Sequence, residues 1–366
     1  MNKVLKSPAK YVQGPGVLYH FDQYLQGAGK TLLILISQSG TKRICPTLET
    51  CFNGTDYTLH YEVFKGECSQ NQIDRLVARA KELNCTAVVG IGGGKILDTA
   101  KGVAYYSALP CIIVPTVAST DSPCSSLSVI YLDNGEFDRY LFLDTCPNMV
   151  VVDTEVIAKA PTNLLVAGMG DALATWFEAR ACRASGSNNQ VAGAPTRAAT
   201  GMAAMCWDLL QKYGVQAKND ADAGLCSEAL ETIVEVNTYL SSVGFESGGL
   251  AAAHAIQKGF TFIPQLHELY HGNKVAFCTL TQLVMEEAEE LNDVLNFCCS
   301  VGLPVCFADM GYYDVDTELL RLAAEKACVS TSTIHNMPMP VNATLLYEAL
   351  LRTNEIGAEF RKNFQQ

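Results

Sequence analysis

The sequence has no long apolar run. Its 366 residues contain no stretch close to the ~20 apolar residues that a membrane-spanning helix requires. The first residues, MNKVLKSPAKYVQGPG, lack the apolar core of a secretory signal. We therefore expect a protein that is neither embedded in a membrane nor secreted, and that resides in the cytoplasm.

Clusters of basic residues are scarce as well. The formal net charge is −12, and lysines and arginines form only short pairs such as Lys42-Arg43. Proteins that bind nucleic acids or anionic membranes without sequence specificity need a positive field. The composition therefore argues against both kinds of partner.

The fifteen cysteines lack the spacing of a disulfide framework or a structural zinc site. Their number is odd, and no C-x-x-C pair occurs. We expect most of them to be buried as small apolar side chains in a reducing compartment.

The patterning up to about residue 155 is typical of an α/β domain. Short apolar runs alternate with helical patterns such as 71–83 and 95–106. The apolar runs predict strands buried on both faces of a parallel sheet, at 31–37, 86–92, 111–116 and 149–154. We therefore predict a Rossmann-like domain with a parallel sheet over residues 1–160.

Two further patterns complete the predicted architecture. Residues 128–142 read as an inserted hairpin that turns at Asn134-Gly135. From Pro161 onward, apolar residues recur at spacings of three and four. An all-α domain over residues 161–366 should therefore follow the α/β domain.

The segment GIGGGK (90–95) joins the second predicted strand to a helical pattern. Consecutive glycines let the backbone approach an anion closely, and free N–H groups at a helix N-terminus favour phosphate. Lys95 can add a positive charge. An ordinary tight turn needs only one glycine, so we favour a pyrophosphate site, although the spacing differs from G-x-G-x-x-G.

A hydroxyl-rich segment, PTVASTDSPCSSLSVIY (115–131), leaves the carboxyl end of the third predicted strand. Ligands of open α/β sheets bind at this edge. Small polar side chains, with Asp121 among them, suit hydrogen bonds to a nucleotide and a polyol. A plain turn cluster of serine and threonine is an equally good interpretation of these residues alone.

Two isolated residues could also bind a metal. Asp171 enters an apolar helical pattern, where helix capping is the default explanation. His254 lies in an alanine-rich helical pattern, where a packed histidine is the common case. Together with a further histidine they would form an open metal site, but no spacing rule connects them.

HELYHG (267–272) matches the zinc-protease pattern H-E-x-x-H. On a helix, His267 and His271 would share one face and could bind zinc, with Glu268 as general base. The H-x-x-G-x-x-H extension is absent, and a peptidase would leave most of the chain unexplained. We therefore disfavour that class of enzyme.

Longer blocks of sequence point to a family: GGGKILDTAK, PTVASTDSPCSSLSVIY, GEFDRYLF, VAGMGDALATWFEARAC, GFESGGLAAAHAI and HGNKVAF. Together they resemble the glycerol dehydrogenases of the iron-containing (group III) alcohol dehydrogenase superfamily, in consistent order from about residue 10 to 360. The resemblance implies a dehydroquinate synthase-like fold with cofactor and metal between the two domains. It also implies NAD-dependent oxidation of a vicinal polyol such as glycerol, to dihydroxyacetone, and large homo-oligomers, octamers among them.

The resemblance also assigns roles by position. Its metal ligands correspond to Asp171, His254 and His271, with zinc usual in this branch and iron in relatives. Its substrate-contacting carboxylate corresponds to Asp121. Its nucleotide contacts correspond to Gly93, Gly94, Lys95, Asp98, Thr116, Ser119, Ser125, Leu127 and Tyr131. For His267, one helical turn before His271, we hypothesise a proton relay, with a packing histidine as the equal alternative.

The sequence departs from the family pattern in two places. An acid usually ends the first strand and binds the adenosine ribose, whereas this chain has Ser37-Gln38 with Lys42-Arg43 close behind. This change leaves NADP open beside NAD. Near the metal ligands, Asn273 stands for the family's glutamate and Cys278 for its glycine, which could alter how the metal is tuned.

Two alternatives share the fold. A glycerol-phosphate dehydrogenase or a dehydroquinate-type synthase would need a basic patch for an anionic substrate, which Asp121 and the alanine-rich surroundings of His254 argue against. A binding protein without catalysis is disfavoured because all three metal-ligating residues are present.

Overall fold

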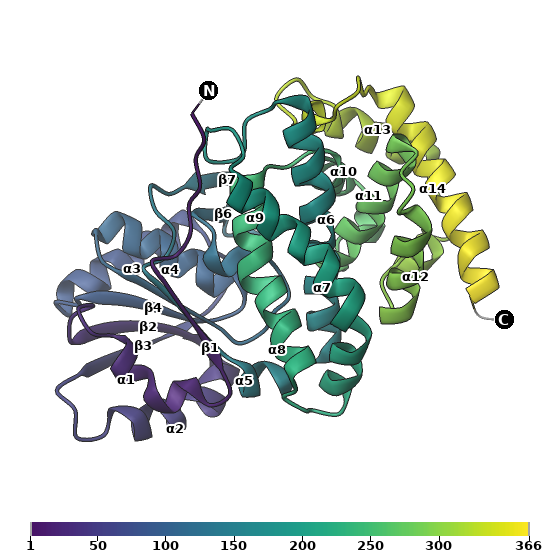
Figure 1. Cartoon of the computed structure of the whole chain (residues 1–366). Coiled ribbons are helices and arrows are strands. Elements are labelled where there is room, and N and C mark those ends of the chain that lie inside the picture. Colours follow the sequence, from purple (N-terminus) through teal and green to yellow (C-terminus); the bar gives the residue numbers. More distant parts are fainter. Residues whose placement is uncertain (1, 365–366) are drawn as a thin grey trace.

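The computed structural model describes residues 2–364 and contains a parallel sheet followed by a helical domain (Figure 1). The sheet strands run in the order β1-β8-β5-β4-β2-β3, and all neighbours are parallel. Their bounds are β1 (Lys10–Gly14), β2 (Thr31–Ser37), β3 (Thr58–Phe64), β4 (Ala87–Gly92), β5 (Cys111–Pro115) and β8 (Met149–Asp153). The predicted fold class is confirmed.

Helices cover both faces of the sheet, because the central strands carry apolar side chains on both faces. One face packs on η1 (Val17–His20), α1 (Phe21–Tyr24) and α2 (Gln38–Phe52), and the other on α3 (Gln70–Glu82) and α4 (Gly94–Ser107). Side chains of β2 alternate between the two faces of the sheet. Leu33 and Leu35 lie on the α4 face, and Leu32, Ile34 and Ile36 lie on the α2 face.

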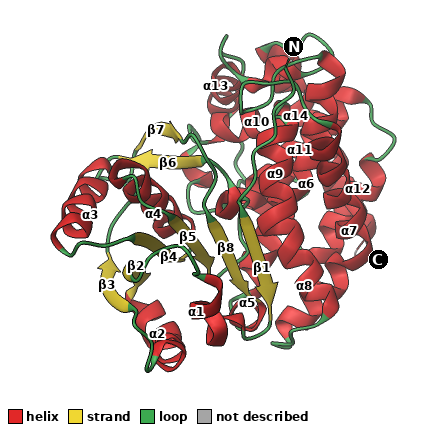
Figure 2. Cartoon of the chain, turned by 60° about the vertical axis from the view of Figure 1, so that its left-hand side comes forward, coloured by secondary structure: helices red, strands yellow, loops and turns green. Residues whose placement is uncertain are grey.

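The predicted hairpin forms a separate two-stranded antiparallel sheet, with strands β6 (Leu127–Tyr131) and β7 (Phe137–Phe142). It stands apart from the main sheet, on the side of α4 (Figure 2). Gly135, in the turn, has φ +90°, a left-handed conformation that glycine adopts without strain.

The second part of the chain is helical, as predicted. After α5 (Thr154–Ala158) its long helices are α6 (Thr162–Ser185), α7 (Arg197–Asp222), α8 (Glu228–Glu235), α9 (Ser241–Gly248), α10 (Ala252–Phe260), α11 (His271–Glu286), α12 (Leu291–Val301), α13 (Thr317–Ala327) and α14 (Ala343–Phe364). A π-helical turn, η3 (Val236–Leu240), joins α8 to α9. Short 3-10 turns are η2 (Ser122–Cys124), η4 (Pro264–Leu266), η5 (Ala308–Met310) and η6 (Thr333–Asn336).

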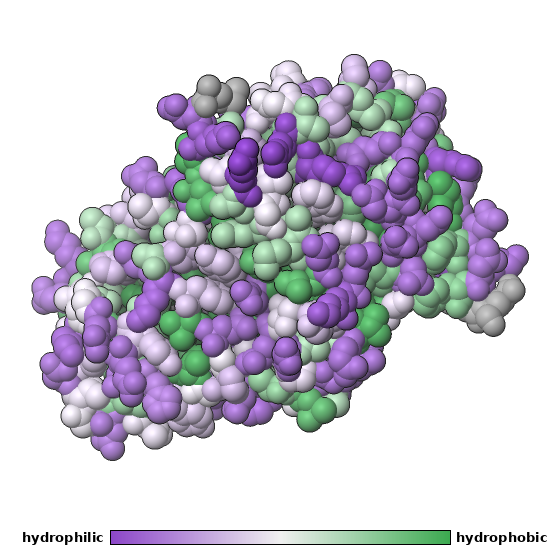
Figure 3. Space-filling model, viewed as in Figure 1, coloured by the Kyte–Doolittle hydropathy of each residue, from purple (hydrophilic) through white to green (hydrophobic). Residues whose placement is uncertain are grey.

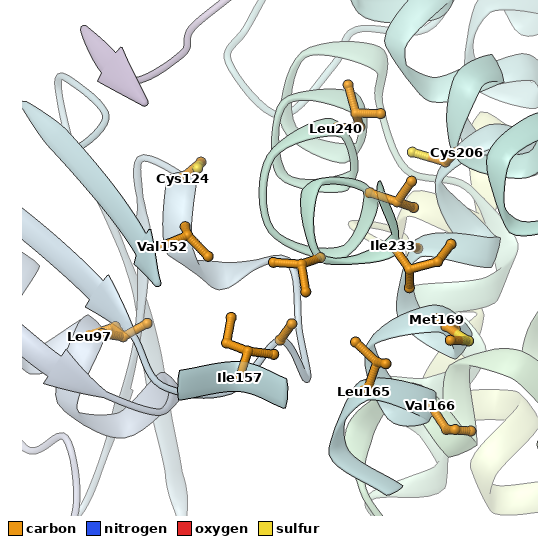
Figure 4. Close-up of a cluster of buried hydrophobic side chains, with 14 of the residues drawn as sticks. Leu97, Cys124, Val152, Ile157, Leu165, Val166, Met169, Cys206, Ile233 and Leu240 are labelled. Atoms are coloured by element: carbon orange, nitrogen blue, oxygen red, sulfur yellow. The ribbon is translucent and has the colours of Figure 1, made fainter. Parts of the chain in front are cut away.

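One hydrophobic core extends through both parts. It joins α3, α4 and one face of the sheet to helices α6, α7, α8 and α12. Figure 4 shows Val152 and Ile157 from the sheet side facing Leu165 and Ile233 of the helical side. A second core lies among α10, α11, α13 and α14.

The start of the chain packs on the helical part. The Val4 N–H donates to the Ala194 carbonyl at 3.3 Å, and the Lys6 N–H donates to Ser247 Oγ at 3.0 Å. We propose a domain boundary between residues 160 and 161, in the short connection from α5 to α6. The first residues of the chain then belong to the α/β domain in sequence but pack on the helical domain.

The surface hydropathy and the burial of the cysteines agree with what the composition predicts. Hydrophilic side chains spread over the face seen in Figure 3, with small hydrophobic patches between them. None of the described helices combines the length and apolar character needed to cross a bilayer. Every cysteine is a free thiol and most are buried, which agrees with the prediction that they serve as small apolar side chains.

Candidate metal and cofactor site

The glycines of the β4–α4 turn divide into two groups. A Cβ on Gly90 would lie 2.6 Å from the Ala100 Cβ, and one on Gly92 would lie 2.6 Å from Ile96 Cδ1, so both allow close packing of α4 on the sheet. A Cβ on Gly93 would meet nothing nearer than 3.7 Å, and one on Gly94 would point into open space. Neither packing nor a positive φ requires glycine at these two positions.

The open glycines begin helix α4 and leave its N-terminus uncapped. Gly93 is the N-cap and has no side chain to bond the first N–H groups of the helix. Such a terminus attracts anions. Gly93 and Gly94 therefore form a backbone cradle that a pyrophosphate can approach, while the Lys95 ammonium is bonded to Glu67 at 2.6 Å.

A buried ion pair organises the chain below this turn. The Asp98 carboxylate accepts hydrogen bonds from Lys101 Nζ at 3.2 Å, from Ser122 Oγ at 2.9 Å and from the Val129 N–H at 3.0 Å. Lys101, only 1% exposed, also donates to the Leu127 carbonyl at 2.9 Å and to Ser125 Oγ at 3.2 Å.

Three of the predicted nucleotide contacts, Asp98, Ser125 and Leu127, thus bond to one lysine that the sequence analysis missed. Lys101 follows Asp98 by three residues, and this helical spacing of opposite charges was the available signal. The ion pair links α4 to the hydroxyl-rich loop.

The hydroxyl-rich loop leads from the glycine turn to the helical domain. Its first member, Thr116, donates its backbone N–H to the Gly92 carbonyl at 3.0 Å. Five residues later, the Asp121 N–H donates to Asp171 Oδ2 at 3.1 Å. The Asp121 side chain has one buried oxygen without a hydrogen-bond partner in the described chain. Burial, together with the Asp171 charge, raises the pKa of Asp121 well above its ordinary value.

The other predicted contacts lie along the same loop and strand. Ser119 is half-buried, midway between Thr116 and Asp121. Tyr131 ends β6, donates its N–H to the Cys68 carbonyl at 2.8 Å, and has a pKa raised by burial. Their roles stay predictions.

Asp171, His254 and His271 converge from three helices. They come from α6, α10 and α11, and their candidate ligand atoms all lie within 4.8 Å of one another. The Nε2 atoms of His254 and His271 lie 3.4 and 3.3 Å from the same Asp171 oxygen. That oxygen, Oδ1, is buried and has no hydrogen-bond partner among the described residues.

These separations fit a divalent cation. Ligands placed 2.0–2.1 Å from a tetrahedral zinc ion lie about 3.4 Å apart, which matches both nitrogen–oxygen separations. Two imidazoles and one carboxylate are also a donor set that zinc and ferrous iron accept. The residues present therefore fit the metal that the resemblance implies.

Glu178 orients one of the histidines, and the sequence analysis missed it. Its Oε2 lies 2.5 Å from His254 Nδ1, and its Oε1 accepts the N–H groups of Ala251 and His254 at 2.9 and 3.0 Å. A carboxylate on Nδ1 keeps the proton there and leaves Nε2 free to bind a metal. Glu178 follows Asp171 by seven residues, two turns along the same face of α6, and that spacing was the available signal.

Charge coupling within the cluster is strong. Burial alone would raise the Asp171 pKa, but His271 and His254 outweigh it and lower that pKa. Burial alone would lower the His254 pKa, yet the Glu178 and Asp171 carboxylates raise it well above its ordinary value. The buried carboxylates thus favour positive charge beside them, which is the electrostatic setting of a cation site.

His267 does not belong to this cluster. Helix α11 begins at His271, and His267 follows the short η4 turn, so the prediction of one helical turn between the two histidines is wrong. The non-helical backbone of Tyr270, the N-cap of α11, separates them. His267 Nε2 bonds the Thr261 carbonyl at 2.9 Å, and the ring is exposed. H-E-x-x-H therefore forms no zinc pair here.

Comparison with known proteins agrees with this geometry. Residues 8–154 match the model of a family described as iron-containing alcohol dehydrogenase. The chain is 48% identical to glycerol dehydrogenase of Citrobacter freundii over 98% of its own length and 99% of that protein. It is 45% identical to glycerol dehydrogenase of Thermotoga maritima, over 97% of its own length and 98% of that protein.

A solved structure gives the same result. The crystal structure of glycerol dehydrogenase from Schizosaccharomyces pombe superposes with a TM-score of 0.94 at 35% identity, over 99% of this chain and 93% of that one. Fold and site thus define a metal-dependent oxidoreductase with a dinucleotide-binding α/β domain. The chain belongs to the iron-containing alcohol dehydrogenase family, as the sequence resemblance indicated.

Proposed function

We propose that this protein is a metal-dependent, NAD-linked dehydrogenase of vicinal polyols, with glycerol, oxidised to dihydroxyacetone, as its leading substrate. One observation carries the proposal. A single loop, Thr116–Asp121, begins at the open glycine turn and ends hydrogen-bonded to the Asp171 carboxylate. A dinucleotide on the turn and a polyol at the three metal-ligating side chains would therefore be neighbours.

Asp171, His254 and His271 would hold the metal, and zinc is our first choice with iron as the alternative. A divalent ion at this position polarises a coordinated hydroxyl and lowers its pKa. Glu178 keeps the His254 ring in the tautomer that presents Nε2 to the ion.

The remaining groups bind and orient the reactants. The α4 N-terminus at Gly93 and Gly94 would hold the pyrophosphate, and residues of the loop after Thr116 would bind the rest of the dinucleotide. Asp121 accepts a hydrogen bond from the second hydroxyl of the diol. NAD, when bound, would accept the hydride that leaves the polyol carbon, and the hydroxyl proton would leave to solvent. A relay role for the exposed His267 stays a prediction.

The end of β2 lacks the acidic side chain that would favour NAD over NADP. Ser37 occupies the position where the family resemblance places an acid, and its hydroxyl caps α2 by accepting the Gly40 N–H at 3.0 Å. An acid there would bond the ribose hydroxyls and repel a 2′-phosphate. We propose NAD as the cofactor, with weaker exclusion of NADP than an acid would give.

The proposal is tested by absorbance at 340 nm, with NAD or NADP and a panel of glycerol, 1,2-propanediol and other vicinal diols. The assay is repeated after chelation and after return of zinc or iron. We expect NAD-linked turnover that chelation removes and a metal restores. His254→Ala and His271→Ala should lose both bound metal and turnover. Full turnover in either variant without metal would end the proposal.

Two further proposals concern the cell and the assembly. We propose a cytoplasmic enzyme that acts on a small polyol and assembles as a homo-oligomer, with an octamer as the state to test. Light scattering after gel filtration measures this mass directly.

A further inference from the structure

A buried asparagine, Asn237, joins the loop that carries Asp121 to the helix that carries Asp171. Asn237 is fully buried in the π-helical turn η3. Its amide group donates to the Ala118 carbonyl at 2.9 Å and to the Leu165 carbonyl at 3.0 Å. Ala118 precedes Asp121 by three residues in the loop, and Leu165 precedes Asp171 by six residues in α6. One side-chain amide therefore joins the segments that carry the two carboxylates.

The loop and α6 pack so closely that there is no room for a side chain at Gly168. A Cβ on Gly168 of α6 would lie 2.0 Å from the Ala118 carbonyl oxygen and 2.3 Å from Asn237 Nδ2. No other residue type fits there without moving the loop. The loop, α6 and the asparagine are thus packed at the closest approach that a backbone allows.

Ser242, on the next turns of the same helical segment, makes a second attachment. Its Oγ donates to the Asp121 carbonyl and accepts the Cys124 N–H at 3.3 Å. The π-helical turn adds one residue to the helix between α8 and α9, and such turns are frequent at functional sites. Asn237 and Ser242 hold the loop on either side of the Asp121 side chain.

We propose that Asn237 is a positioning residue for polyol oxidation, which fixes the location of Asp121 relative to the metal-binding Asp171. This inference rests on the proposed function, because it takes Asp121 to bind the second hydroxyl of the substrate. Loss of the two Asn237 hydrogen bonds frees the loop at Ala118 and displaces Asp121. The defect should therefore concern the second hydroxyl and leave the metal in place.

The experiment compares 1,2-propanediol with 2-propanol. Both are oxidised at a secondary carbon, and only the diol has the neighbouring hydroxyl. Asn237→Leu has a similar branched shape but no donor. We expect its diol-to-monool ratio of kcat/KM to fall about tenfold, which corresponds to the loss of one hydrogen bond. The KM for the diol should rise, and the bound metal should match the wild type.

Ser241→Ala is the matched control. Ser241 is equally buried and adjacent to Ser242, but its Oγ bonds Thr175 Oγ1 at 2.8 Å and does not contact the loop. It should lose stability and keep the wild-type substrate ratio. If Asn237→Leu does not fold, Ser242→Ala removes the second attachment and should lower the ratio in the same direction.

The outcomes separate the two hypotheses. A wild type without NAD-linked diol oxidation would defeat the proposed function. An active wild type together with a folded Asn237→Leu that keeps both its diol preference and its diol KM would overturn the positioning role. Equal losses on both alcohols would also overturn it, because general destabilisation affects every substrate alike.

Discussion

Replacing Glu178 by glutamine should weaken metal binding without unfolding the protein. Glu178 makes three contacts, and glutamine can keep two of them, because its carbonyl oxygen still accepts the N–H groups of Ala251 and His254. The third contact is inverted. The new amide N–H₂ faces His254 Nδ1 and makes that atom an acceptor. The ring proton then moves to Nε2, which points at Asp171 Oδ1 from 3.4 Å.

The expected magnitude follows from this inversion. A metal must now displace the proton on Nε2, and loss of such outer hydrogen-bond partners typically costs about 10–100-fold in metal affinity. At about 1.4 kcal/mol per tenfold change, the loss is roughly 1.4–2.8 kcal/mol. Folding should suffer little, because the amide still bonds the ring and no buried group loses its partner.

The assay titrates metal-depleted protein with Zn²⁺ in competition with a chelator of known affinity. Gln282→Met is the matched control, since Gln282 accepts the N–H groups of Ala252 and Ala253 at 3.1 and 3.2 Å and supports the same end of α10 without touching the ring. Zinc affinity in Glu178→Gln equal to that of the wild type would refute the reasoning. So would an equal loss in the control, which would assign the effect to helix packing.

Three other predictions concern the glycine turn, the end of β2 and the buried carboxyl group of Glu246. Gly94→Ala adds a Cβ in open space, so Tm should stay unchanged. The KM for NAD should rise about tenfold, because one close phosphate contact is lost. The control Gly92→Ala places its Cβ 2.6 Å from Ile96 Cδ1 and should instead lower Tm. Ser37→Asp should raise the ratio of kcat/KM for NAD to that for NADP about tenfold or more, because an acid repels the 2′-phosphate, and an unchanged ratio would show that β2 does not approach the ribose. Burial raises the pKa of Glu246 above its usual 4.5, so the folded protein holds that proton more tightly than the unfolded chain and loses stability as the pH rises above about 4.5. Glu246→Gln removes this dependence, and its Tm relative to the wild type should increase from pH 4.5 towards neutral; a difference that stays constant with pH would contradict the assignment.

The buried strands could be predicted from the sequence, but the edge strands could not. TLLILIS forms β2 over the predicted residues, since a strand covered on both faces must be apolar throughout. β1 and β3 lie at the two edges of the sheet, are only partly buried, and carry polar residues such as Lys10 and Glu62. Helix α2 was also missed, because Pro46 lies inside its pattern.

The grouping of the metal-ligating residues depends on tertiary packing. Asp171, His254 and His271 lie on three helices far apart in sequence, so no local spacing could join them, and only the family resemblance did. The local match at His267 was misleading because the helix begins four residues later. Asn237 acts through backbone carbonyls alone, and such partners leave no trace in a sequence pattern.

The three ligating helices also differ in which core they serve. α10 packs only in the second core, whereas α6 and α11 contribute side chains to both cores. An ion held by Asp171 and His254 therefore acts as a cross-link between the body of the molecule and its C-terminal helices. Its binding energy adds to the stability of the fold as well as to catalysis. In the metal-free protein, amide hydrogen exchange should accelerate first in α10 and α13, and the chain should become open to proteolysis there before the sheet loosens.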